Sequence, residues 1–160
     1  MAHRSGTILA IGCLVLAVPV WAGQAEEAIE RVIKGAAQAT ATFSETRDAH
    51  AVLKRYAQDY LGVQDGEAET RDSIETWLAD YESALKQGST LRFISAVSNL
   101  KAGLAGSTAW ATYDYLFQAI RSGELEGEDA GKCTTLLRKE ASTWLIFHDH
   151  CSKTRSGLGR

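Results

Sequence analysis

Two histidines near the C-terminus, in the segment "TWLIFHDHCS" (143–152), stand out as candidates for chemistry. Residues two apart on a β-strand point to the same face, so His148 and His150 would present two imidazoles side by side. A zinc site requires a third protein ligand, and Asp149 would point the opposite way. We therefore expect no metal site. Two interpretations stay open: hydrogen bonds to neighbouring strands, or acid–base chemistry by one imidazole on a bound carbonyl.

Aromatic side chains form a second candidate group. Tyr113, Tyr115 and Phe117 alternate along one predicted strand and share its face with Ala109 and Ala111. Large rings beside small alanines are typical of a strand that lines a cavity, where phenolic hydroxyls can form hydrogen bonds with a ligand. They are equally typical of a packed core. The predicted ligand-binding residues are Tyr56, Trp77, Tyr81, Tyr113, Tyr115, His148 and His150.

Two cysteines, Cys133 and Cys151, fall on the two strands of a predicted C-terminal hairpin. A three-residue connection over 140–142 would place Cys133 opposite Asp149, which leaves Cys151 two residues out of register. A disulfide would then require a bulge, a longer loop or a diagonal arrangement. From the sequence, a disulfide and two free thiols are both open.

The first half of the chain reads as helical. Apolar residues recur at helical spacing over 26–44, over a segment that starts at Asp48 and includes Tyr56 and Tyr60, and over 70–86. Asp48 is a plausible N-cap, and Gly88 suits a helix end.

The second half changes to strand-like patterns. We predict strands over 90–104, 108–120, 132–139 and 143–152, since these segments are rich in β-branched and aromatic residues. The polar segment 122–131 is predicted to be a loop. Three helices followed by antiparallel strands predict an α+β fold, in which a strongly curved sheet wraps around the helices and encloses a pocket.

The composition is that of an ordinary globular protein. The chain has 160 residues, 45% of them hydrophobic and 23% charged, which predicts one domain. A net charge of −3 offers no broad basic surface, so we expect no nucleic-acid partner. The sequence has no glycine-rich phosphate loop or nucleophile elbow, and no cofactor is expected.

The N-terminal residues 1–22 have the pattern of a secretory signal peptide. His3 and Arg4 precede a continuous apolar run over 7–21, and small or branched residues occupy the positions that signal peptidase recognises. We predict cleavage after Ala22 and a periplasmic or secreted protein.

Cleavage would leave a domain over 23–153 and a flexible tail over 154–160, without a stable membrane anchor. Lipid modification of Cys13 is the weaker alternative, because "AIGC" matches that motif poorly.

Four segments in order resemble the SnoaL-like branch of the nuclear transport factor 2-like superfamily, over roughly residues 26–153. They are "YAQDYLGVQDGE", "TRDSIETWLADY", "STAWATYDYLFQA" and "STWLIFHDHCS". The resemblance implies a cone-shaped fold with an internal pocket. Its members include ketosteroid isomerases, polyketide cyclases, epoxide hydrolases, dehydratases and binding or association domains, so the fold alone does not define a function.

By this resemblance Asp65 falls near the general base of the isomerases. The alternative is a turn aspartate before Gly66. The isomerases also carry a tyrosine on the first helix, and the segment 26–44 has none, which argues against steroid isomerisation.

Three functions stay open. The first is binding of a small, largely apolar molecule. The second is an isomerase, cyclase or dehydratase that uses Asp65 or His148. The third is an interaction module that forms a homodimer.

Overall fold

The computed structural model describes residues 20–154 and confirms an α+β fold. The predicted signal peptide therefore lies almost entirely outside the described residues, as does the tail beyond Thr154. None of the helices in the described part of the chain is long and apolar enough to cross a membrane. The elements are α1 (Val20–Thr46), α2 (Ala49–Leu53), β1 (Tyr56–Gln64), β2 (Glu67–Thr70), α3 (Arg71–Lys86), β3 (Arg92–Ala105), β4 (Thr108–Arg121), β5 (Glu124–Glu140) and β6 (Thr143–Lys153).

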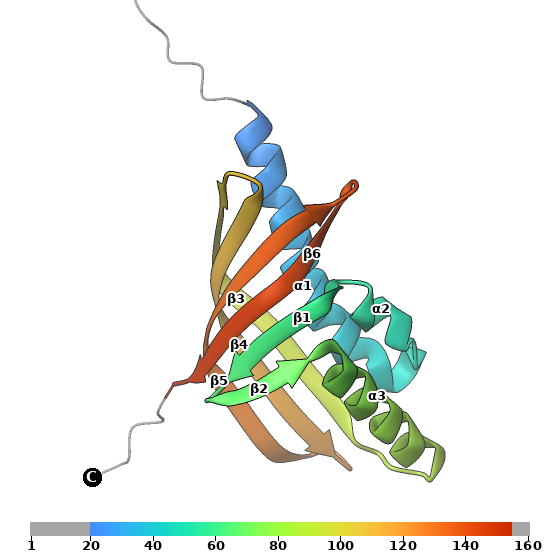
Figure 1. The fold of residues 1–160 in the computed structure, drawn as a ribbon. Helices are drawn as coiled ribbons and strands as arrows, with labels where there is room; N and C mark the ends of the chain where they lie inside the picture. Colours follow the sequence, from blue (N-terminus) through green and yellow to red (C-terminus); the bar gives the residue numbers. More distant parts are fainter. Residues whose placement is uncertain (1–19, 155–160) are drawn as a thin grey trace, which may run out of the picture.

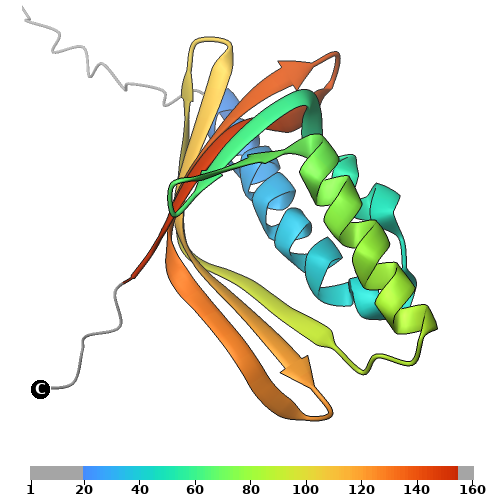
Figure 2. The ribbon, with the colours of Figure 1, turned by 60° about the horizontal axis from the view of Figure 1, so that its bottom comes forward.

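The six strands form one sheet in the order β2-β1-β6-β5-β4-β3 (Figure 1). All neighbouring pairs are antiparallel except β1 and β6, which run parallel. Figure 2 shows the sheet bent strongly toward one side, with α1 and α3 against its concave face. The curved sheet and its helices thus agree with the predicted architecture, although β1 and β2 come before α3 in the chain.

The predicted helix ends are confirmed in part. Thr70 caps α3, where its hydroxyl accepts from the Ser73 amide, and Asp48 caps α2 by accepting from the Ala51 amide. Helix α1 begins at Val20, earlier than predicted, so the predicted cleavage point after Ala22 lies within it.

The prediction that the second helix includes Tyr56 and Tyr60 was wrong. Helix α2 ends at Leu53, and both tyrosines lie on β1. A spacing of four residues places side chains on one face of a helix and also on one face of a strand, so the pattern did not distinguish the two. Residues 56–64 form a strand because they pair with β2 on one side and with β6 on the other.

The predicted loop over 122–131 was also wrong, because β4 and β5 continue as a long hairpin around a turn at Ser122 and Gly123. Residues 124–128 are exposed. This end of the hairpin therefore has no buried face, and its polar composition does not prevent it from pairing as strands.

The register of β5 and β6 differs from the prediction in two ways. The connecting turn has two residues, Ala141 and Ser142, and a bulge at Phe147 shifts the pairing by one more residue. Together these place Cys133 directly opposite Cys151, and the two form a disulfide.

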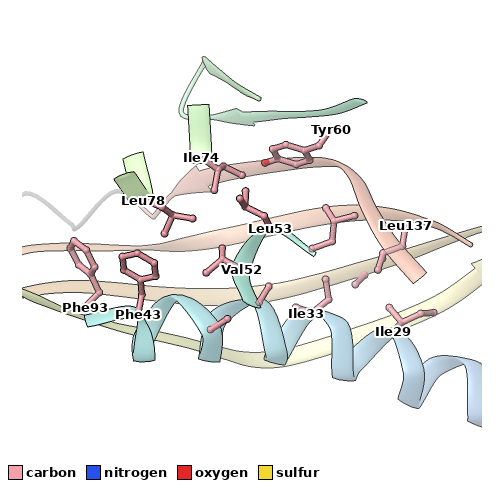
Figure 3. Close-up of a cluster of buried hydrophobic side chains, with 14 of the residues drawn as sticks. Ile29, Ile33, Phe43, Val52, Leu53, Tyr60, Ile74, Leu78, Phe93 and Leu137 are labelled. Atoms are coloured by element: carbon pink, nitrogen blue, oxygen red, sulfur yellow. The ribbon is translucent and has the colours of Figure 1, made fainter. Parts of the chain in front are cut away.

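The core lies between the helices and the concave face of the sheet (Figure 3). Helix α1 contributes a buried stripe with a helical period, as the sequence predicted. Its largest members, Ile29 and Phe43, are almost completely buried. Figure 3 shows side chains from α1, α2, α3 and the strands converging: Ile29, Ile33, Phe43, Val52, Leu53, Tyr60, Ile74, Leu78, Phe93 and Leu137.

Candidate functional site

Two adjoining cavities lie between the helices and the concave face of the sheet. The first, the α1 cavity, has a volume of about 200 Å³ and is lined on one side by Ile33, Ala36, Ala37 and Thr40 of α1. The second, the α3 cavity, has a volume of about 320 Å³ and is lined by Ile74 and Trp77 of α3. Lining residues common to both are Thr40, Tyr56, Gln64, Glu69 and Phe117. These shared walls show that the two cavities meet.

A row of residues across three strands forms the polar end of the α1 cavity. Gly62 on β1 is the register partner of Glu69 on β2 and of Asp149 on β6. The Tyr60 side chain, two residues earlier on the same face of β1, reaches over Gly62. Its hydroxyl oxygen lies 3.0 Å from Glu69 Oε2 and 2.9 Å from Asp149 Oδ1. We call Glu69, Tyr60 and Asp149 the acid triad.

Gly62 is required for this arrangement. A Cβ atom at this position would lie 2.6 Å from Asp149 Oδ1 and would also overlap the Tyr60 hydroxyl. Any larger residue would therefore force the triad apart, and glycine here provides space, since its own backbone has no positive φ.

Tyr60 contacts two carboxyl groups but has only one hydroxyl hydrogen to donate to them. A phenol has one hydrogen to donate, so Tyr60 can bond to only one ionised carboxylate at a time. The second short contact becomes a hydrogen bond only when that carboxyl is itself protonated. The geometry therefore favours a state in which Glu69 and Asp149 together hold a proton.

The electrostatics agree with this picture. Burial raises the pKa of Glu69, and the charge of Asp149 raises it further, against a lowering by the Tyr60 hydrogen bond. Burial likewise raises the pKa of Asp149, which the Tyr60 hydrogen bond and the two nearby histidines partly offset. Burial and both carboxylates raise the pKa of the Tyr60 phenol, so it stays protonated and acts as a donor.

Two further phenols, Tyr56 and Tyr113, lie near the triad, and a third, Tyr115, lines the same cavity. The Tyr56 ring packs edge-on against Tyr60 with ring centroids 4.8 Å apart, and burial raises the pKa of Tyr56 well above its ordinary value. Burial raises the pKa of Tyr113 to about 12, and its hydroxyl lies 3.1 Å from Thr135 Oγ1. Tyr115 lines the α1 cavity, and its buried hydroxyl oxygen has no hydrogen-bond partner among residues 20–154.

The α3 cavity contains a cluster of aromatic rings. Trp77 and Phe93 lie with ring centroids 5.4 Å apart, and Phe93 stacks on Phe117 at 4.8 Å. All three rings line the cavity. Both cavities therefore combine aromatic rings with carboxyl groups, and Glu69 lines both of them.

A comparison with protein-family models identifies the SnoaL-like domain over residues 33–156, more than half of the chain. The chain belongs to the SnoaL-like domain family. The predicted resemblance is thereby confirmed. A comparison with curated protein sequences found no significant match.

Solved structures support the same fold at low sequence identity. A nuclear transport factor 2-like protein of unknown function from Pseudomonas putida is 19% identical, with a TM-score of 0.60, and the match covers 85% of this chain and 91% of that one. The β subunit of benzoate 1,2-dioxygenase from Burkholderia mallei is 10% identical, with a TM-score of 0.66 and coverage of 82% and 92%. A calcium/calmodulin-dependent protein kinase II association domain, so described from Xanthomonas campestris, is 18% identical, with a TM-score of 0.58 and coverage of 80% and 86%. At these identities the likeness concerns the fold alone.

In this SnoaL-like domain Asp65 lies outside both cavities. It occupies the two-residue turn between β1 and β2 with φ of 51°, followed by Gly66 with φ of 92°. Its carboxylate accepts from the Lys153 amide at 2.8 Å and pairs with the Lys153 ammonium at 3.3 Å. These contacts are those of a turn residue that joins β1–β2 to the end of β6.

The bulge at Phe147 decides which face of β6 meets the cavity. Before it Ile146 points inward, and after it Asp149 and Cys151 point inward and line the α1 cavity. His148 and His150 consequently lie on the opposite face, where His148 Nδ1 is 2.7 Å from the Leu61 carbonyl oxygen.

Among residues 20–154, no cluster of three or more histidine, cysteine or acidic side chains has the arrangement of a metal site.

The predicted aromatic residues divide into two sets. Tyr56, Trp77, Tyr113 and Tyr115 line the cavities. Tyr81 instead packs in the core against Phe43 and Phe93, and its hydroxyl donates to the Leu91 carbonyl.

Sequence reasoning missed the acid triad. Asp149 was judged only as a metal ligand for the adjacent histidines, and Tyr60 was placed on a helix. Glu69 lies in a short polar segment with no apolar alternation, and nothing local marks it as buried. A weak signal existed in β6, where Asp149 lies between two histidines directly after the apolar residues 144–147.

Proposed function

We propose that this SnoaL-like domain binds a small, largely apolar molecule that carries a polar group. The observation that supports the proposal is a pair of joined cavities with mainly apolar walls, into which the carboxyl groups of Glu69 and Asp149 also project. Such a lining would hold an apolar body against Trp77, Phe93 and Phe117 and orient its polar group toward the acid triad.

The cavity sizes suit a ligand of this kind. The α3 cavity measures about 320 Å³, at the lower end of the range of about 300–1,000 Å³ for small-molecule sites, and the adjoining α1 cavity adds about 200 Å³.

We also infer that the domain works outside the cytoplasm. The leader pattern of residues 1–22 supports export. The Cys133–Cys151 disulfide supports an oxidising compartment.

A second candidate is an acid–base enzyme centred on Asp149 and Glu69 rather than on Asp65 and His148. Two buried carboxyls that share a phenol and have raised pKa values are suited to keep one proton and exchange it with a bound substrate. The homodimeric interaction module stays a prediction without a specific observation in its favour.

Ligand extraction tests the binding function. A filling variant, Ala37→Phe, would place a ring in the α1 cavity, whereas Gln38→Phe adds the same ring on the exposed side of α1 and serves as the control. We expect denaturation of the exported protein to release one small molecule per chain from the native domain and from the control, detected by mass spectrometry, and much less from Ala37→Phe.

Equal recovery from the folded Ala37→Phe domain would contradict binding in this cavity. Its folding is checked independently by urea unfolding.

A further inference from the structure

The charged side chains that line the two cavities are all acidic. Glu69 and Asp149 line the α1 cavity, and Asp129 joins Glu69 in the lining of the α3 cavity. No lysine, arginine or histidine lines either cavity within the described chain. Asp129 already has a partner, because the Lys153 ammonium lies 2.9 Å away. Glu69 and Asp149 have no ion pair within residues 20–154, so the uncompensated negative charge concentrates at the triad.

The other charged and titratable groups around the triad do not supply a cation to it. The Arg55 guanidinium, just before β1, packs against Gly35 of α1 and is not part of either lining. His148 and His150 lie on the outer face of β6. The remaining titratable groups that face the carboxyls are the phenols of β1 and β4, which stay neutral, and α1 presents only aliphatic side chains and Thr40.

The two carboxylates are close enough to share one cation. Because the Tyr60 hydroxyl oxygen lies 2.9 Å from one carboxylate oxygen and 3.0 Å from the other, those two oxygens are no more than about 6 Å apart. A primary ammonium has three hydrogens and no acceptor, and it can donate to both carboxylates at once. Aromatic rings of Tyr56 and Phe117 line both cavities and offer π faces to such a cation.

We propose that the ligand of this cavity is an organic amine in its protonated form, with its ammonium between Glu69 and Asp149 and its apolar body in the α3 cavity. This inference rests on the proposed binding function and adds the chemical class of the ligand. The ammonium would lie beside the Tyr60 hydroxyl and supply the positive charge that a shared proton supplies in the free domain. Neutral alcohols satisfy only one carboxylate, and anions meet repulsion from both.

Three probes of one shape test the proposal. They are 2-phenylethylamine, which is a cation at pH 7.5, 2-phenylethanol, which is neutral, and phenylacetate, which is an anion. Binding to the full exported domain is measured by calorimetry and by Trp77 fluorescence, since that indole lines the α3 cavity. We expect the amine to bind about tenfold more tightly than the alcohol, and phenylacetate to bind least.

Variants that remove one negative charge test whether the acid triad causes the preference for the amine over the alcohol. Glu69→Gln and Asp149→Asn are each expected to bring the amine-to-alcohol affinity ratio close to one. The control Glu67→Gln removes the same charge from an exposed position on the same strand, and it should keep the ratio.

The outcomes separate the two proposals. If 2-phenylethanol binds as tightly as the amine, or Glu67→Gln lowers the ratio as much as Glu69→Gln, the amine proposal is overturned while the binding function stands. If none of the three probes binds while the native domain still releases a ligand on denaturation, the amine proposal is overturned and the binding function stands; if no ligand is released either, both proposals fail.

Discussion

Replacing Glu69 by glutamine should stabilise this domain above neutral pH, which is the opposite of the usual effect of changing a buried polar residue. The reason is the contact of two carboxyls with one phenol. Burial raises the folded-state pKa of both Glu69 and Asp149 above the unfolded values of about 4. The folded state therefore holds more protons than the unfolded state, and its stability falls as pH rises from about 4 through the raised pKa values.

The magnitude follows from the geometry. Two unit charges about 6 Å apart repel by about 3 kcal/mol at the effective dielectric constant of about 20 that describes partly buried groups. Glutamine removes this repulsion and keeps a carbonyl acceptor for Tyr60. The weaker, uncharged hydrogen bond costs about 1 kcal/mol. We expect Glu69→Gln to raise the free energy of unfolding by about 2 kcal/mol at pH 8 and to have little effect, or a small destabilising one, at pH 4.

Urea unfolding at the two pH values, with the disulfide intact, measures this difference. The control is Glu67→Gln, which changes the net charge equally at an exposed position and should give similar stability changes at pH 4 and pH 8. Two results would refute the reasoning: Glu69→Gln destabilises the domain as much at pH 8 as at pH 4, or the control reproduces the gain at pH 8.

Three further predictions concern packing and covalent structure. Gly62→Ala should break the acid triad, because the added methyl group overlaps its side chains. We expect the free energy of unfolding to fall by about 1–3 kcal/mol and 2-phenylethylamine to bind more weakly. Unchanged binding would contradict the role given to this glycine. Replacing both Cys133 and Cys151 by serine should lower the free energy of unfolding by about 3 kcal/mol, as expected for a crosslink that closes a loop of this size, and reductant should then have no further effect on the urea midpoint. Leu137→Ala should lower the free energy of unfolding by about 2–5 kcal/mol, because that side chain is completely buried. Leu125→Ala, at a side chain that is 56% exposed, should change it by less than about 0.5 kcal/mol. Similar losses at the two sites would contradict the assignment of the core.

Local sequence patterns predicted the framework of the fold well. The apolar stripe of α1 and the Asp48 cap of α2 are properties of neighbouring residues, which act through helix geometry alone. The change from helical spacing to β-branched and aromatic runs after Gly88 likewise predicted an α+β domain. Four family-like segments in order led to the SnoaL-like assignment.

The arrangement of the candidate site depended on contacts between distant segments. The Phe147 bulge moves Asp149 and Cys151 into the cavity and the histidines out of it, and strict alternation along a strand cannot show such a shift. Tyr60 joins the site only because β1 pairs in parallel with β6.

By itself, therefore, the sequence predicted the first and third helices, four of the six strands, the fold class and the two cysteines of the C-terminal hairpin. Only the tertiary structure decided that Glu69, Tyr60 and Asp149 meet. They come from three strands aligned by hydrogen-bond register on either side of Gly62. Register and bulges are set by the packing of the whole sheet, whereas the periodicity of a single segment reports only which of its own residues share a face.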